Sequence, residues 1–134
     1  MATEEIIYLS YAEAVVIHIE LMRHLGETRY GVFDRTLIES ALARPQQSAT
    51  YESADLMSQA ASLLYGLIKN HPWVGGNKRT ATALTQIFLR RNGFRIVAVV
   101  DDLVDLVLAV EAGRWQTDDI ESWLRSHVIL LARE

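Results

Sequence analysis

Apolar residues recur every three or four positions along most of this 134-residue chain, and capping residues or glycines separate one such run from the next. This spacing places the apolar side chains of a run on one face of a helix. Helices of that kind bury their apolar faces by packing against one another. Because no linker-like stretch divides the chain, we expect residues 1–134 to form a single all-α domain.

The capping residues and apolar runs predict about six helices. Ser10 and Glu13 form a capping box at the start of the first helix, which Gly26 ends. The other five predicted helices lie between Asp34 and Pro45, between Ser53 and His71, between Asn77 and Gly93, between Asp101 and Gly113, and from Thr117 through Leu131. The helix that begins at Ser53 has the widest apolar face, so we expect it at the centre of the core.

Two segments depart from the helical pattern. Residues 46–52 are polar and follow Pro45, which favours an exposed loop able to contact a partner or target. Residues 94–100 are rich in β-branched side chains, but a single short run without an evident partner does not make a sheet. We therefore expect an extended segment there.

The composition excludes several classes of protein. The chain has no cysteine, so disulfide frameworks and thiolate metal sites are ruled out. Its N-terminus is acidic where a signal peptide would be basic, and no apolar run approaches the roughly 18 residues of a membrane span. We expect a cytoplasmic protein without membrane contact.

Charge is unevenly distributed along the chain. The formal net charge is −4, yet the segment from Leu56 to Val100 contains six basic residues and no acid. This cationic middle favours an anionic ligand. RNA binding through Arg90, Arg91 and Arg95 is a weaker hypothesis, because the acidic flanks and the lack of interleaved aromatic residues argue against a nucleic-acid partner.

Residues 71–79, with the sequence HPWVGGNKR, lie inside the cationic segment. His71 is the side chain of this stretch that can accept a proton near neutral pH, which makes it the candidate general base. A histidine that only caps the preceding helix, or packs beside Trp73, is the alternative interpretation. We favour the base because a glycine pair and two cations follow it.

The remainder of the stretch suits a phosphate group. A glycine pair lets backbone N–H groups at the start of a helix approach an anion, and a following asparagine is a plausible helix cap. Cations in a first helical turn oppose the helix dipole, which points to an anionic guest. The candidate phosphate-binding residues are Lys69, Gly75, Gly76, Asn77, Lys78 and Arg79.

Other catalytic and metal-binding patterns are absent from the sequence. There is no P-loop, no zinc-protease motif and no nucleophile elbow. His18, His24 and His127 have no spacing that indicates a metal site, so we interpret them as ordinary helix residues.

Residues 71–81, HPWVGGNKRTA, resemble the signature of the Fic/Doc family, in the form found in Doc, the death-on-curing toxins of toxin–antitoxin modules. The resemblance extends to residues 37–45, 63–68 and 88–93, and so covers most of the chain. It implies an α-helical Fic-type domain in which the histidine is the base, while the glycine loop and the following helix hold nucleotide phosphates.

The resemblance also implies a reaction and partners. Most Fic relatives transfer AMP to a protein hydroxyl, whereas Doc proteins have a lysine after the motif asparagine, lack the second arginine, and phosphorylate a threonine of elongation factor Tu. Lys78 matches the lysine of the Doc form, and residues Ala81 and Thr82 supply no second arginine. The implied catalytic residues are His71, Lys78 and Arg79, the implied substrates are ATP with Mg²⁺, and the implied partner is an antitoxin whose disordered C-terminal segment folds onto the toxin.

The chain departs from the family pattern at two positions. Trp73 replaces the usual Phe, which we expect to be only a larger core anchor. Gly75 stands where the family has the acid that holds Mg²⁺, so the motif itself offers no metal ligand. Asp34, Glu39 and Asp55 are acids that folding could bring to the site instead.

Three functional hypotheses follow. The first is a Doc-type kinase whose activity is attenuated by Gly75. The second is a catalytically silent Fic-fold module that binds a nucleotide or an antitoxin. The third is an AMP transferase that acts on a protein hydroxyl.

Overall fold

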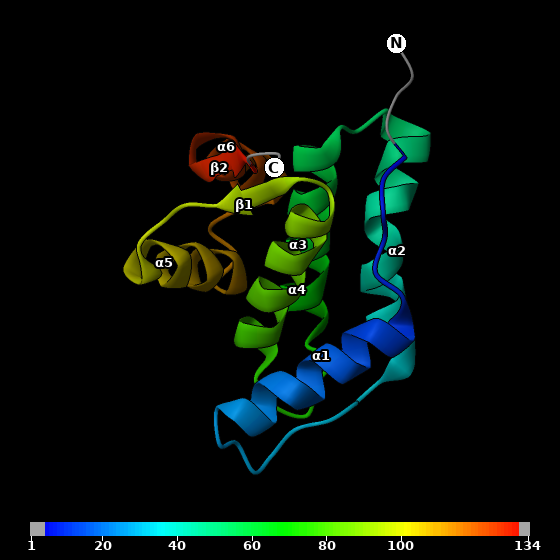
Figure 1. The fold of residues 1–134 in the computed structure, drawn as a ribbon, viewed down its shortest axis with the longest axis vertical. Helices are drawn as coiled ribbons and strands as arrows, with labels where there is room; N and C mark the ends of the chain where they lie inside the picture. Colours follow the sequence, from blue (N-terminus) through cyan, green and yellow to red (C-terminus); the bar gives the residue numbers. More distant parts are fainter. Residues whose placement is uncertain (1–4, 132–134) are drawn as a thin grey trace.

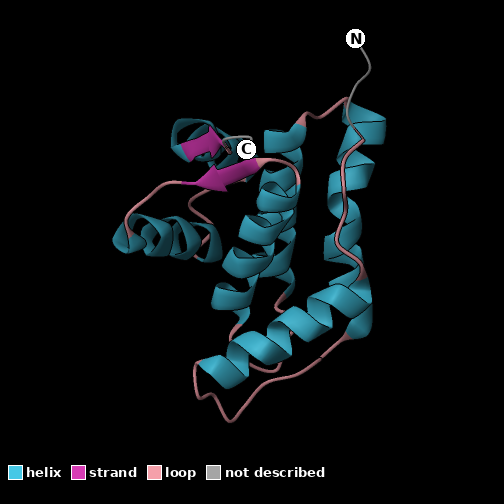
Figure 2. Cartoon of the chain, viewed as in Figure 1, coloured by secondary structure: helices cyan, strands magenta, loops and turns pink. Residues whose placement is uncertain are grey.

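The computed structural model of this chain describes residues 5–131, which form six α-helices and two short strands (Figures 1 and 2). The helices are α1 (Tyr11–His24), α2 (Arg35–Glu52), α3 (Leu56–Asn70), α4 (Asn77–Arg91), α5 (Val100–Glu111) and α6 (Thr117–His127). The strands are β1 (Phe94–Ile96) and β2 (Val128–Leu130). The expectation of a predominantly helical domain with about six helices is confirmed.

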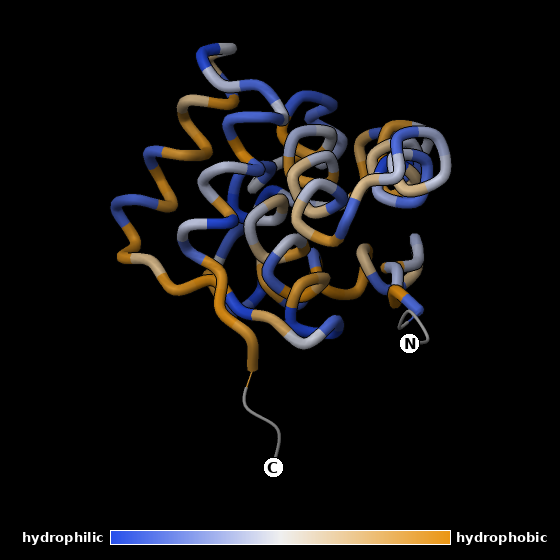
Figure 3. Tube along the Cα trace, turned by 90° about the horizontal axis from the view of Figure 1, so that it is seen from above, coloured by the Kyte–Doolittle hydropathy of each residue, from blue (hydrophilic) through white to orange (hydrophobic). Residues whose placement is uncertain are grey.

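Helices α3 and α4 form the centre of the molecule, and the other helices surround them (Figure 1). Helix α2 packs along α3, α1 crosses the end of the bundle where the α3–α4 loop lies, and α5 and α6 lie on the side away from α2. Apolar and polar residues alternate along the chain trace within the helices, as the helical spacing requires (Figure 3). None of the helices within residues 5–131 is long and apolar enough to cross a membrane.

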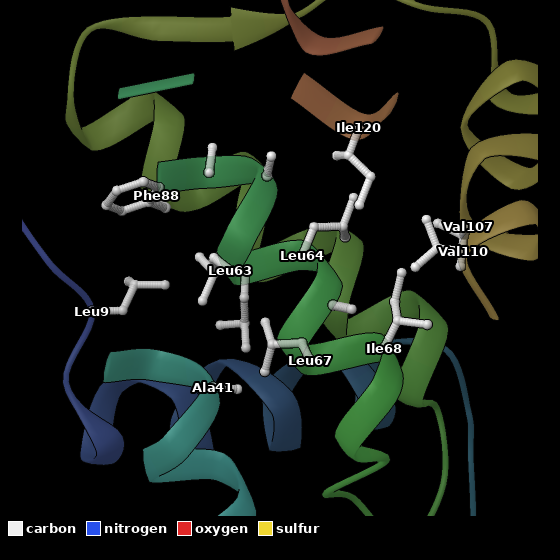
Figure 4. Packing of buried hydrophobic residues seen from close by; sticks show 14 of the residues in the cluster. Leu9, Ala41, Leu63, Leu64, Leu67, Ile68, Phe88, Val107, Val110 and Ile120 are labelled. Atoms are coloured by element: carbon white, nitrogen blue, oxygen red, sulfur yellow. The ribbon is translucent and has the colours of Figure 1, made fainter. Parts of the chain in front are cut away.

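The core is built around α3, as its wide apolar face predicts. Leu63, Leu64, Leu67 and Ile68 are buried on successive turns, in one cluster with apolar side chains from α2, α4, α5 and α6 (Figure 4). Full burial of one such side chain is worth roughly 1.5–3 kcal/mol relative to exposure. The C-terminal end of α3 is therefore anchored firmly, and the loop that follows starts from a fixed point.

Helix α2 is longer than predicted, and the expected loop at residues 46–52 is wrong. Pro45 lies inside the helix and is buried, so it removes one backbone hydrogen bond without ending the helix. The helix continues along α3, and the two helices pack closely at Gly66, where a Cβ would lie 3.4 Å from Cα of Ala41 and 2.4 Å from the side-chain Cδ of Arg44. The Arg44 guanidinium also donates a 3.0 Å hydrogen bond to the Ser62 carbonyl oxygen of α3.

The predicted boundary between α2 and α3 is shifted. Ser53 adopts the left-handed conformation (φ 54°) and ends α2, so its expected role as the cap of α3 is wrong. Asp55 caps α3 instead, because its carboxylate accepts a 3.1 Å hydrogen bond from the backbone N–H of Ser58. Ser53 and Asp55 are both common helix caps, and the sequence alone does not show which of them begins α3.

The expectation that residues 94–100 find no partner strand is also wrong. Residues Phe94–Ile96 pair antiparallel with Val128–Leu130, so that Arg95 lies opposite Ile129. The partner strand, Val128–Leu130, falls within the range predicted for the sixth helix, which ends at His127 rather than continuing through Leu131. At its other end, Gln116 rather than Thr117 caps that helix.

Candidate functional site

The loop between α3 and α4 presents His71 with one ring nitrogen bound and the other available. His71 ends α3 in the left-handed conformation (φ 49°), and its Nδ1 lies 3.0 Å from the carbonyl oxygen of Ile68. Because a carbonyl oxygen only accepts, Nδ1 must carry the hydrogen and donate it. The lone pair of neutral His71 is then on Nε2, the nitrogen that a general base needs. His71 therefore ends the helix and, when neutral, keeps the lone pair of Nε2 available.

The start of α4 has the features of an anion site. Gly76 is its N-cap (φ 68°) and has no side chain to satisfy the N–H groups of the first turn. The predicted capping role of Asn77 is wrong, since Asn77 is already the first helical residue. Its side-chain amide instead bonds the backbone of Trp73, accepting from the N–H at 3.0 Å and donating to the carbonyl at 2.9 Å. This pair of bonds fixes the loop between the histidine and the helix.

Both motif glycines are closely packed. A Cβ on Gly76 would lie 2.4 Å from Sδ of Met22 on α1, and one on Gly75 would lie 2.5 Å from the carbonyl oxygen of Arg29. The Met22 side chain is flexible, whereas the Arg29 contact is with backbone. An acidic side chain at position 75 would have to project into space that the backbone of Arg29, in the segment after α1, already occupies.

That segment is held against the motif by backbone hydrogen bonds. The Val74 N–H donates to the Gly31 carbonyl at 2.9 Å, and the Pro72 carbonyl accepts from the N–H groups of Phe33 and Asp34 at 3.0 and 3.1 Å. These bonds form a short strand-like clamp, with a bridge between Val32 and Trp73. The position of the motif therefore depends on the loop between α1 and α2.

His18 joins this clamp to α1 and α4. Its ring is fully buried and stacks on Trp73 at 4.1 Å between ring centres. Its Nε2 accepts a 2.9 Å hydrogen bond from the Gly31 N–H, so Nδ1 carries the hydrogen and donates to Thr80 Oγ1 at 2.8 Å. Burial lowers the pKa of His18 to about 4, which keeps the ring neutral as these bonds require.

Helical spacing alone had marked His18 as an ordinary helix residue, and it gives no sign of this role. Trp73, by contrast, is the buried anchor that we expected, with 2% of its surface exposed.

The two cations of the motif are paired with acids from distant parts of the chain. Lys78 Nζ lies 3.1 Å from Oε2 of Glu111, at the end of α5, and Arg79 lies 3.5 Å from Glu27, after α1. The same Glu111 oxygen is 3.8 Å from Nε2 of His71. All of these side chains are about a third or more exposed, and such pairs contribute at most about 1 kcal/mol. A phosphate could therefore replace either carboxylate at low cost.

The acids considered from sequence are used elsewhere. The carboxylate of Asp34 caps α2, that of Glu39 pairs with Arg35, and Asp55 caps α3 and pairs with Arg125. Glu111 is the acid that reaches His71 and Lys78, and no local pattern around it signals this.

The structure does not add Lys69 to the site. It is an exposed residue in the last turn of α3 and has no ion pair within residues 5–131. Its predicted phosphate contact stays a prediction. The same residues contain no group of three or more His, Asp or Glu side chains able to hold a metal ion on their own.

Comparison with known proteins decides the family. Residues 8–89, which include α1, α2, α3 and most of α4, match the Fic/DOC family model. The chain belongs to the Fic/DOC family. Toxin Doc of Mycolicibacterium smegmatis is 40% identical over 99 residues, which cover 69% of this chain and 75% of that protein. Protein kinase doc of Escherichia phage P1 is 30% identical over 121 residues, 88% of this chain and 93% of that protein. This Fic/DOC protein is of the Doc type.

We expect the stability of this Fic/DOC protein to fall between pH 6.5 and about 4. The folded-state pKa of His18 is about 4, below its ordinary value of 6.5, so in this range the unfolded chain takes up a proton that the folded chain does not. The contribution of His18 is fully present above pH 6.5, and about 3 kcal/mol of it is lost as the pH falls to 4. Denaturant unfolding across this range measures the loss. An NMR titration that places the ring pKa of folded His18 near 6.5 would contradict it.

Proposed function

We propose that this Fic/DOC protein is a Doc-type toxin that transfers the γ-phosphoryl group of ATP to a threonine of elongation factor Tu, with activity attenuated by Gly75. The observation that carries the proposal is that His71 Nε2 and Lys78 Nζ approach the same Glu111 oxygen, at a helix start whose N-cap has no side chain. A base, a cation and free backbone donors together are what a phosphoryl transfer needs from a protein.

In the proposed reaction the threonine hydroxyl oxygen attacks the γ-phosphorus while its proton passes to Nε2 of His71. The bond between the γ-phosphorus and the oxygen that bridges it to the β-phosphate breaks, and ADP leaves. Lys78 and Arg79 turn from their carboxylates to the phosphates, which their weak exposed pairs permit. Mg²⁺ would neutralise charge that develops on the phosphate oxygens.

Kinase chemistry is favoured over AMP transfer. Lys78 stands directly after the motif asparagine, and Ala81–Thr82 supplies no second arginine, as in the Doc form of the signature. The relative from phage P1, named as a protein kinase, supports the same choice. The relative named Toxin Doc supports an antitoxin as the partner of this chain. The resemblance to the Doc form supports the further proposal that a disordered C-terminal segment of the antitoxin folds onto the toxin.

The close contact at Gly75 keeps a second function open, a silent module that binds nucleotide or antitoxin without turnover. The loop lacks the family acid, and the Arg29 carbonyl occupies the space into which that acid would project. Such a module would bind ATP but transfer nothing.

We expect His71→Gln to lower the rate of phosphate transfer to elongation factor Tu by about 10²–10⁴-fold, because the hydroxyl loses its base. His24→Gln is the matched control, since His24 is an exposed histidine at the end of α1. The assay uses ATP with Mg²⁺ and measures the mass of the modified protein. A phosphoryl adduct supports the kinase, and an AMP adduct would contradict it. ATP binding by the unaltered chain without transfer would favour the silent module.

The attenuation by Gly75 is tested with Gly75→Asp, and Gly75→Ala is the matched control. Both variants place a Cβ against the Arg29 carbonyl, so we expect both to lower the free energy of unfolding by about 1–3 kcal/mol. If the missing carboxylate limits the rate, the folded Asp variant transfers phosphate faster than the folded Ala variant. Equal rates in the two variants would show that the missing acid is not what limits activity.

A further inference from the structure

Glu111 is a carboxylate at the proposed phosphate site, and the helix that carries it is anchored in the core. It is the last residue of α5, whose Val107 and Val110 are buried in the core beside Ile68 (Figure 4). Its Oε2 lies 3.1 Å from Nζ of Lys78 and 3.8 Å from Nε2 of His71. Helix α5 therefore brings an acid to the proposed base and cation of the site.

An acid in this position conflicts with phosphate binding unless a cation lies between them. A phosphate held between His71 and the first turn of α4 would lie close to the Glu111 carboxylate, which reaches both His71 and Lys78, and two negative groups a few ångströms apart repel each other. Either Glu111 weakens nucleotide binding, or a divalent cation bridges it to the phosphate oxygens. The two possibilities differ in how Mg²⁺ should act.

The packing at position 75 favours the bridging cation. The motif acid of the family is absent, and the Arg29 carbonyl lies 2.5 Å from the place where a Cβ would begin. A protein carboxylate that binds a metal at this site would therefore come from another part of the chain. Both Glu27 and Glu111 pair with a cation of the motif, but of these two Glu111 also approaches Nε2 of His71, at 3.8 Å.

We propose that Glu111 is the protein carboxylate that binds the divalent cation accompanying the nucleotide. This inference rests on the proposed function, because the phosphates of the nucleotide supply the other ligands. Mg²⁺ commonly binds through one or two carboxylates, substrate phosphate oxygens and waters, which a single glutamate satisfies. Residues 5–131 have no three-ligand cluster, so the cation would bind with the nucleotide and not before it.

The test is the effect of Mg²⁺ on the affinity for a non-hydrolysable ATP analogue, measured by calorimetry in Mg²⁺ and in EDTA. The variant is Glu111→Gln, and Asp105→Asn on the exposed face of α5 is the matched control. We expect Glu111→Gln to bind the analogue more tightly than the unaltered chain in EDTA, because repulsion is removed. In Mg²⁺ we expect it to bind about tenfold more weakly, because the ligand is lost. The control should match the unaltered chain in both buffers.

Two other outcomes would overturn the proposal. If Glu111→Gln binds the analogue more tightly in both buffers, Glu111 only opposes the nucleotide and is not a metal ligand, while the proposed function stands. If the unaltered chain binds no analogue in either buffer, the proposed function fails as well. A Glu111→Asp variant, which keeps a shorter carboxylate, checks the result independently: it should retain part of the Mg²⁺ effect, and complete loss of that effect would count against a ligand role. Thermal unfolding of each variant confirms that it is folded.

Discussion

Two hydrogen bonds and one stacking contact of the buried His18 ring connect the three parts of the chain that shape the site. The Gly31 N–H, the Thr80 hydroxyl and the ring of Trp73 all meet this one imidazole, so it ties the loop after α1, the first turns of α4 and the motif loop together. The arrangement works only while the ring is neutral, because Nε2 must accept from a backbone donor. Burial supplies that condition by lowering the pKa of His18.

Around this fixed centre, the groups proposed to act on a nucleotide are held more loosely. Lys78 and Arg79 make exposed ion pairs with Glu111 and Glu27, which a phosphate can replace. His71 combines a backbone position set by the end of α3 with a side chain that is 54% exposed. The segment from Leu56 to Val100 contains no acid, yet folding brings Glu111 and Glu27 to its cations. A phosphate can take the place of either carboxylate.

Local features of the sequence predicted much of the fold and the motif. The capping box at Ser10, the wide apolar face of α3 and the break before Pro72 depend on neighbouring residues, and the structure has them as expected. The errors came from contacts between distant residues. Packing against α3 carries α2 through Pro45, and the pairing of residues 94–96 with 128–130 is invisible to periodicity. For the same reason Glu111 was not predicted as a site residue, since it reaches the site only because α5 packs beside α3 and α4.

The central claim is that the start of α4 binds nucleotide phosphates next to His71. Backbone amide NMR during titration with an ATP analogue and Mg²⁺ tests it most directly. The account predicts that the largest shifts fall on the amides of Gly76, Asn77, Lys78 and Arg79, with the ring of His71 responding at the same concentrations. Saturable shifts confined to another surface, with these amides unchanged, would contradict it.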